Sequence, residues 1–137
     1  MIKKLLAVIF AILCLFSVKV ANAQPIFKGY ADSFELYLGG QKSGVEIVRA
    51  SKNLFPFIDN VCGESFKMDA SNFNLETFLE QFNAQILFIE EISEGTCYYA
   101  YSPKIKYRRQ VLGKIVNLHV FVGKQITVGS PIIYGSF

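Results

Sequence analysis

Five cationic side chains lie between residues 104 and 114, in a part of the chain that has no acidic residue. They are Lys104, Lys106, Arg108, Arg109 and Lys114. The first three alternate with Ile105 and Tyr107, a spacing that places three cations on one face of an extended strand. Such a row suits a polyanion: teichoic acid phosphates, phospholipid headgroups or an acidic protein. The alternative is an edge strand whose charges oppose aggregation, or one that meets an acidic helix of the same fold.

The charges of the whole chain are polarised in the same sense. Residues 24–94 contain 5 basic and 11 acidic residues, whereas residues 95–137 contain 6 basic and no acidic ones. The two parts carry net charges of −6 and +6, so the formal charge of +3 comes from three lysines within residues 1–23. A chain that is neutral after residue 23 gives no support to nucleic-acid binding based on its pI. We therefore expect no nucleic-acid partner.

Two cysteines are further candidates for chemistry. Cys62 and Cys97 are the pair that remains if residues 1–23 are removed. In an oxidising compartment they form either a disulfide or two buried free thiols. Their separation excludes the CxxC geometry of redox motifs and zinc ribbons.

His119 is the sole histidine, so no metal site can draw on a second imidazole, and we predict no metal. It shares a strand face with Asn117. A solvated strand histidine is a simpler interpretation of His119 than a catalytic base. No glycine-rich phosphate loop is present, so we predict no cofactor. These features favour a domain without catalytic residues.

Carboxylates leave open the alternative of a cell-wall hydrolase or a regulator of one. Glycoside hydrolysis needs two carboxyl groups on either side of the scissile bond. Glu90 and Glu91 are adjacent, so they face opposite sides of a strand, and the chain has no tryptophan to stack on a sugar. We therefore rank the hydrolase second.

The first 23 residues have the three parts of a secretory signal. Lys3 and Lys4 precede an apolar run over Leu5–Phe16, and the segment ends in Ala-Asn-Ala at Ala23. An apolar run of about 12 residues is short for a bilayer, which needs about 20. We predict cleavage after Ala23 and an exported protein, extracellular or at the cell surface. The alternative is an uncleaved N-terminal anchor, and only then do we expect a membrane contact.

Residues 24–137 have the pattern of a single exported α+β domain without a repeat or a long polar linker. Leu75, Phe78, Leu79 and Phe82 have helical spacing, which predicts one main helix over about Ser71–Asn83. A cap at Ser71 or Asn74 would begin it, and Asn83 tolerates the left-handed conformation that ends many helices.

Alternating and β-branched segments predict a curved, mainly antiparallel sheet packed against this helix. The predicted strands are residues 34–38, 45–48, 61–68, 86–92, 96–101, 107–112, 115–122 and 127–134. The first two should form a hairpin with a loop of five to six residues. Pro131 should confine the last strand to an edge or a bulge, because proline has no backbone N–H for a ladder.

The C-terminal third resembles a known family. Asn117-Leu118-His119-Val120-Phe121-Val122, followed by Val128-Gly129-Ser130-Pro131-Ile132-Ile133, is similar to the C-terminal signature of the YwmB-like exported proteins of Firmicutes. The resemblance covers about Tyr98–Phe137, and His119 stands where glutamine is usual in that family. It implies a signal-bearing protein without an established catalytic activity. It also implies a TATA-box-binding-protein-like fold.

Taken together, the leader, the cationic row and the missing catalytic motifs predict a non-catalytic binding or scaffolding domain at the cell envelope. The expected partner is an anionic wall polymer or an envelope protein.

Overall fold

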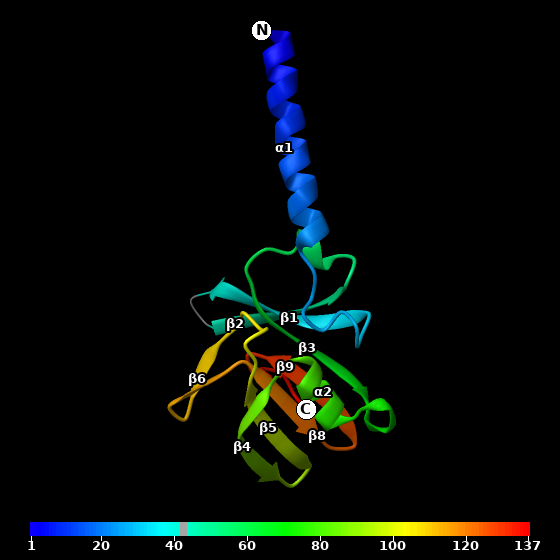
Figure 1. Ribbon diagram of the computed structural model, residues 1–137, viewed down its shortest axis with the longest axis vertical. Helices are drawn as coiled ribbons and strands as arrows, with labels where there is room; N and C mark the ends of the chain where they lie inside the picture. Colours follow the sequence, from blue (N-terminus) through cyan, green and yellow to red (C-terminus); the bar gives the residue numbers. More distant parts are fainter. Residues whose placement is uncertain (42–43) are drawn as a thin grey trace.

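Seven strands form one antiparallel sheet in the computed structural model, which describes residues 1–41 and 44–137. Its strands are β1 (Ser33–Gln41), β2 (Gly44–Ser51), β3 (Val61–Asp69), β4 (Gln85–Ile92), β5 (Gly95–Tyr101), β8 (Leu118–Val122) and β9 (Gln125–Ser130). Their order across the sheet is β2-β1-β3-β9-β8-β5-β4. A separate ribbon consists of β6 (Arg109–Val111) and β7 (Lys114–Val116). The predicted α+β class with a mainly antiparallel sheet is confirmed (Figure 1).

Helix α1 (Ile2–Asn22) extends away from this sheet and contacts the 3-10 helix η1 (Phe55–Phe57) (Figure 1). Among the side chains that the structure describes, the two hydrophobic clusters begin at Ile26. Within the described residues, no helix is both long enough and apolar enough to cross a membrane.

Helix α2 (Leu75–Gln81) is the predicted main helix. It begins later and ends earlier than the predicted range of about Ser71–Asn83. Asn74 begins it, because its side chain accepts a hydrogen bond from the backbone N–H of Thr77 at 2.9 Å. Residues 70–72 form a separate 3-10 turn, η2 (Ala70–Asn72), so the option of a start at Ser71 is wrong. Asn83 has φ 48°, the left-handed conformation expected of it.

The hydrophobic core lies between one face of the sheet and the segments that cover it. Phe66, Val120 and Val128 project from the central strands on this face and are buried. Phe27 and Phe78 cover them, with the Phe27 ring centroid 5.2 Å from that of Phe66 and 6.2 Å from that of Phe78. Burial of such side chains stabilises the fold by roughly 1.5–3 kcal/mol each.

Strand β9 differs from the prediction in place and in length. It lies in the middle of the sheet between β3 and β8 and ends at Ser130. The prediction of an edge strand or a bulge reaching Tyr134 is therefore wrong. Pro131 cannot donate to a ladder, so the strand stops one residue before it. The chain then folds back over Gly129, where an added Cβ would lie 2.8 Å from the carbonyl oxygen of Ile132.

Two further strand predictions need correction. The predicted 115–122 strand is interrupted at Asn117, which lies between β7 and β8. The Asn117 side chain binds the backbone of residues 102–105. Its Oδ1 accepts a hydrogen bond from the N–H of Ser102 at 2.7 Å, and its Nδ2 donates one to the carbonyl oxygen of Ile105 at 3.1 Å. The predicted β1–β2 hairpin is confirmed, but its strands reach Gln41 and Gly44, so the connection is shorter than five residues. Residues 42 and 43 lie outside the described residues.

Candidate functional site

The cationic row has the predicted alternation without the predicted strand. Residues 104–108 are irregular, and only residues 109–111 of the expected 107–112 strand join a ladder. Ile105 and Tyr107 are buried, whereas the cations on either side of them are exposed. Asn117 replaces a strand partner here, because its amide binds the backbone of residues 102 and 105. The cations therefore face solvent because Asn117 holds this segment, and the alternating sequence did not predict that contact.

Lys104 and Lys106 each make a contact of their own. The Nζ of Lys104 donates to the carbonyl oxygen of Gln81 at 3.0 Å, which satisfies an end group of α2. The Nζ of Lys106 lies 5.1 Å from the ring centroid of Tyr107. In the described part of the chain, the ion pairs are Arg49–Glu35 and Lys52–Asp32. The row therefore does not dock onto the carboxylates of the acidic helix.

Arg108 and Lys114 line one hollow of about 400 Å³, which we call the ribbon groove. Its lining residues are Gln85, Leu87, Tyr101, Arg108, Lys114 and Ile115. The groove forms because β7 packs beside β5, which brings the ribbon against the outer strands of the sheet. The guanidinium carbon of Arg108 lies 5.5 Å from the ring centroid of Tyr101, within range of a cation–π contact. This stacking holds the guanidinium in one orientation.

The tip of the ribbon adds exposed apolar surface to the cations. Leu112 has 83% of its surface exposed and φ 49°, and Gly113 follows with φ 77°. These two left-handed residues make the tight turn that joins β6 to β7. Ile115 is also exposed and lies in the ribbon groove. The groove thus has apolar walls beside two positive charges.

Arg109 turns away from the groove to the C-terminal tail. Its Nη1 donates to the hydroxyl of Tyr134 at 2.7 Å, and its guanidinium carbon lies 5.2 Å from the Tyr134 ring centroid. The backbone N–H of Tyr134 in turn donates to the hydroxyl of Tyr37 at 3.2 Å. Arg109 also borders a smaller hollow with Arg108 and Gln110. Its main described contacts tie the ribbon to the tail.

The two cysteines of the domain are free thiols in the structure. Cys62 lies on β3 and Cys97 on β5, with strands β9 and β8 between them. Adjacent strands are about 4.8 Å apart, so the two backbones are separated by roughly 14 Å, whereas a disulfide needs Cα atoms within about 7 Å. The expected disulfide is not formed here, and the alternative of two free thiols describes the structure.

His119 is buried, with 3% of its surface exposed, so the prediction of a solvated histidine is wrong. The C-terminal tail covers it: its Nδ1 accepts a hydrogen bond from the backbone N–H of Ile133 at 3.1 Å. Its ring stacks on Tyr99 with centroids 4.2 Å apart. Burial lowers the pKa of His119 to about 4. The neutral ring therefore packs and holds the tail.

Glu64 is the titratable residue whose place the sequence did not reveal. It lies on β3 in the hydrophobic core and is fully buried. Its Oε1 accepts a hydrogen bond from the backbone N–H of Phe27 at 2.9 Å, while its Oε2 has no partner. Burial raises the pKa of Glu64 to about 7, against the smaller opposing effect of these backbone hydrogen bonds. The one available signal is that Glu64 shares its strand face with Cys62 and Phe66, two positions away on either side.

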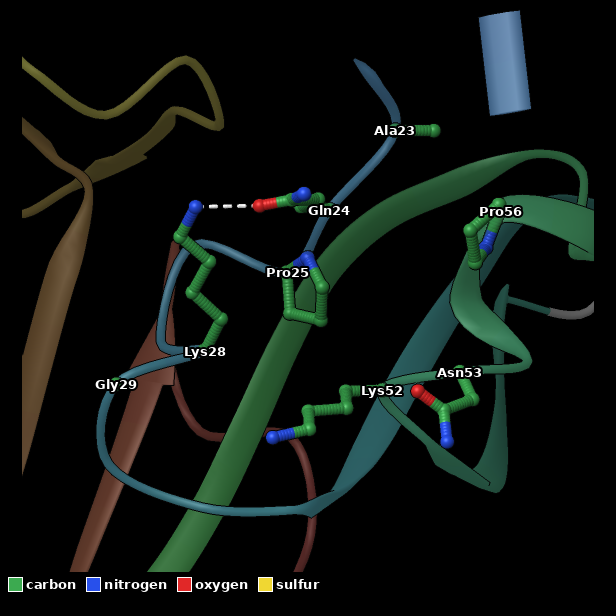
Figure 2. A pocket seen from close by; sticks show the side chains of 8 residues that line it. All are labelled: Ala23, Gln24, Pro25, Lys28, Gly29, Lys52, Asn53 and Pro56. Atoms are coloured by element: carbon green, nitrogen blue, oxygen red, sulfur yellow. Dashed lines mark hydrogen bonds between the residues drawn. The ribbon is translucent and has the colours of Figure 1, made fainter. Parts of the chain in front are cut away.

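A second cavity lies where α1 meets the domain, and we call it the junction cavity. It has a volume of about 580 Å³ and is lined by Ala23, Gln24, Pro25, Lys28, Gly29, Lys52, Asn53 and Pro56. Figure 2 shows the Lys28 side chain reaching the side-chain oxygen of Gln24, to which its Nζ donates a hydrogen bond. Lys52 is paired with Asp32 at 3.0 Å.

Comparisons of the chain with protein-family models, curated proteins and solved structures found no match. In the parts of the chain that the structure describes, no three His, Cys, Asp or Glu side chains gather as metal ligands. Of the five cations singled out in the sequence, Arg108 and Lys114 share a groove. Function is therefore inferred from the geometry of that groove.

Proposed function

We propose that the domain is an exported, non-catalytic binding module of the cell envelope that holds a phosphate-bearing wall polymer in the ribbon groove. The observation that carries this proposal is the shared hollow of Arg108 and Lys114, two cations that have no acidic ion-pair partner among the described residues. An anionic envelope protein is the other partner expected of such a surface. The polymer is favoured because its repeating phosphates match closely spaced cations.

The chemistry of the two cations suits phosphate. A guanidinium presents a planar fork of donors that matches two phosphate oxygens, and the ammonium of a lysine acts as a point charge. Tyr101 holds the Arg108 fork, so less side-chain freedom is lost on binding. Leu87 and Ile115 form apolar walls, which strengthen the attraction by lowering the local dielectric constant.

The arrangement of the N-terminus supports export with a removable leader. The hydrophobic clusters contain no described residue before Ile26. Phe27 is buried in the core, and its backbone is bound by Glu64. Cleavage after Ala23 would therefore leave the core contacts in place.

The hydrolase alternative draws no comparable support from the cavities. One hollow contains Glu35 and another contains Glu94, each as its one lining carboxylate. Glycoside hydrolysis needs two carboxyl groups about 5–9.5 Å apart. The hydrolase stays a prediction, as do the membership of the YwmB-like family and the TATA-box-binding-protein-like fold.

A co-sedimentation experiment tests the proposal. The exported protein is mixed with insoluble, teichoic-acid-bearing wall and with the same wall stripped of its phosphate polymer. We expect retention on the first at low salt and its loss at high salt, because the screening length falls from about 10 Å at 0.1 M to about 3 Å at 1 M. No retention at low salt, or equal retention on the stripped wall, would contradict the proposal. Retention by an acidic envelope protein alone would replace the polymer as partner.

A further inference from the structure

The residue after the predicted cleavage site is Gln24, which lies at the junction cavity and is exposed (Figure 2). An N-terminal glutamine carries its own electrophile, because its α-amine and its side-chain amide can close a five-membered ring. We propose that Gln24 is a modification site, where the new N-terminus cyclises to pyroglutamate after the leader is removed. This inference rests on the cleavage after Ala23 that the proposed function includes.

The reaction needs no oxidant and no second substrate. The neutral α-amine of Gln24 attacks Cδ of its own side chain, and a new N–Cδ bond forms. The bond between Cδ and Nε2 breaks, and one molecule of ammonia leaves with the proton released by the amine. The terminal positive charge is lost, as in other modifications that block a chain end.

Lys28 is placed to assist this step. Its Nζ donates a hydrogen bond to Oε1 of Gln24, the oxygen on which negative charge develops when the amine adds to Cδ. A donor aimed at such an oxygen lowers the barrier by stabilising that charge. The two residues are four positions apart, and Figure 2 shows the tips of their side chains pointing toward each other. The same ammonium also disfavours a second positive charge on the nearby amine.

The chain beyond Gln24 is fixed, so cyclisation leaves the fold intact. Pro25 is buried and has a restricted backbone. Phe27 is fully buried, and its N–H is held by Glu64 at 2.9 Å. Gln24 itself contributes no side chain to the hydrophobic clusters. Gln24 is exposed, so the ring forms at the surface without displacing a core residue.

The consequence is a neutral, blocked end beside Lys28. Aminopeptidases outside the cell need a free α-amine, so the cyclised chain resists trimming into the segment that Glu64 holds. The chain end also loses its positive charge, so the cyclised chain is one charge unit more negative than the chain with a free α-amine.

The test starts from the full chain, released in vitro by signal peptidase, with the intact mass followed over time. The expected product is residues 24–137 lighter by one ammonia molecule and closed to aminopeptidase. A mass of residues 24–137 that keeps its ammonia would overturn the inference and leave the export proposal standing. An uncleaved chain, or cleavage elsewhere, would contradict both the inference and the predicted cleavage after Ala23.

Two lysine variants separate the role of Lys28 from general charge. Lys28→Gln should slow the loss of ammonia on the order of threefold, because an exposed donor contributes less than one in a closed active site. Lys52→Gln is the matched control: it removes an equal charge from the same cavity, and its Nζ is bound to Asp32. Its rate should equal that of the unaltered chain. Equal rates in all three proteins would remove Lys28 from the step.

Discussion

The backbone N–H of Phe27 donates a hydrogen bond to Oε1 of Glu64 at 2.9 Å, inside the hydrophobic core. This contact joins the segment that follows α1 to the centre of the sheet, between residues 37 positions apart. The second oxygen of Glu64 has no partner in the described structure. A buried carboxyl with one unsatisfied oxygen favours its protonated form, which makes the stability of the fold depend on pH.

The contribution of Glu64 to stability should fall as the pH rises. Its folded pKa of about 7 lies above the ordinary value of 4.5. The folded state therefore binds the proton more tightly, so this contribution is complete below pH 4.5 and is lost by about pH 7. The shift corresponds to ~3 kcal/mol. Because His119 acts in the opposite direction below pH 6.5, the stability of Glu64→Gln in urea unfolding should rise with pH between 4.5 and 6.5, where that of the unaltered chain stays nearly level. Glu76→Gln, at an exposed helix position, is the control and should follow the unaltered chain.

His119 should act in the opposite direction. Its folded pKa of about 4 lies below the ordinary value of 6.5, because burial disfavours the charged ring. Its contribution to stability is therefore complete above pH 6.5 and is lost as the pH falls towards 4, by ~3 kcal/mol. His119→Gln keeps an acceptor for the N–H of Ile133 and should remove this loss. Unfolding curves of the variant between pH 4.5 and 6.5 should show stability falling with pH. A variant that follows the unaltered chain would contradict the buried neutral histidine.

Gly129 should tolerate no side chain, because the C-terminal tail folds back against it. A Cβ there would lie 2.8 Å from both the carbonyl oxygen of Ile132 and Cγ1 of Ile133. Gly129→Ala should destabilise the protein by about 1–3 kcal/mol through overpacking. Gly29→Ala is the control, since nothing lies within 4 Å of its added Cβ. Thermal unfolding compares the two, and an equal Tm for both variants would contradict the packing of the tail.

The thiols of Cys62 and Cys97 should both be open to alkylation once the protein is unfolded without a reductant. In the folded protein, Cys97 should react slowly, because it is buried and burial raises the pKa of its thiol. Cys62 is half-buried and should react sooner. Mass measurement after each labelling counts the modified thiols. An unfolded, unreduced protein that takes up no label would indicate a disulfide.

Local patterns predicted the elements well. The spacing of Phe78 and its neighbours, with a capping residue such as Asn74, located α2, and the β-branched runs located the sheet. In each case the cause acts within a few residues of the chain.

Contacts between distant segments decided the rest. The sequence does not state that Phe27 returns to Glu64, nor that the tail after Pro131 covers His119. The first contact buries Glu64, whose position the sequence leaves unassigned, and the second buries His119, which the sequence predicts to be solvated. The ribbon groove has the same origin: the tight turn brings Lys114 beside Arg108, whereas Arg109 points to Tyr134. Adjacency in sequence could not separate those two arginines.

The central claim is that Arg108 and Lys114 act together in the ribbon groove, and its most direct test is the dissociation constant for soluble teichoic acid. The double variant Arg108→Gln/Lys114→Gln should bind about thirtyfold more weakly, at about 1 kcal/mol for each cation near a phosphate surface. The control, Lys104→Gln/Lys124→Gln, removes two charges from the same basic part of the chain outside the groove. Its affinity should stay within about threefold of the unaltered protein. Equal weakening of both variants would contradict a defined site and leave only a diffuse positive surface.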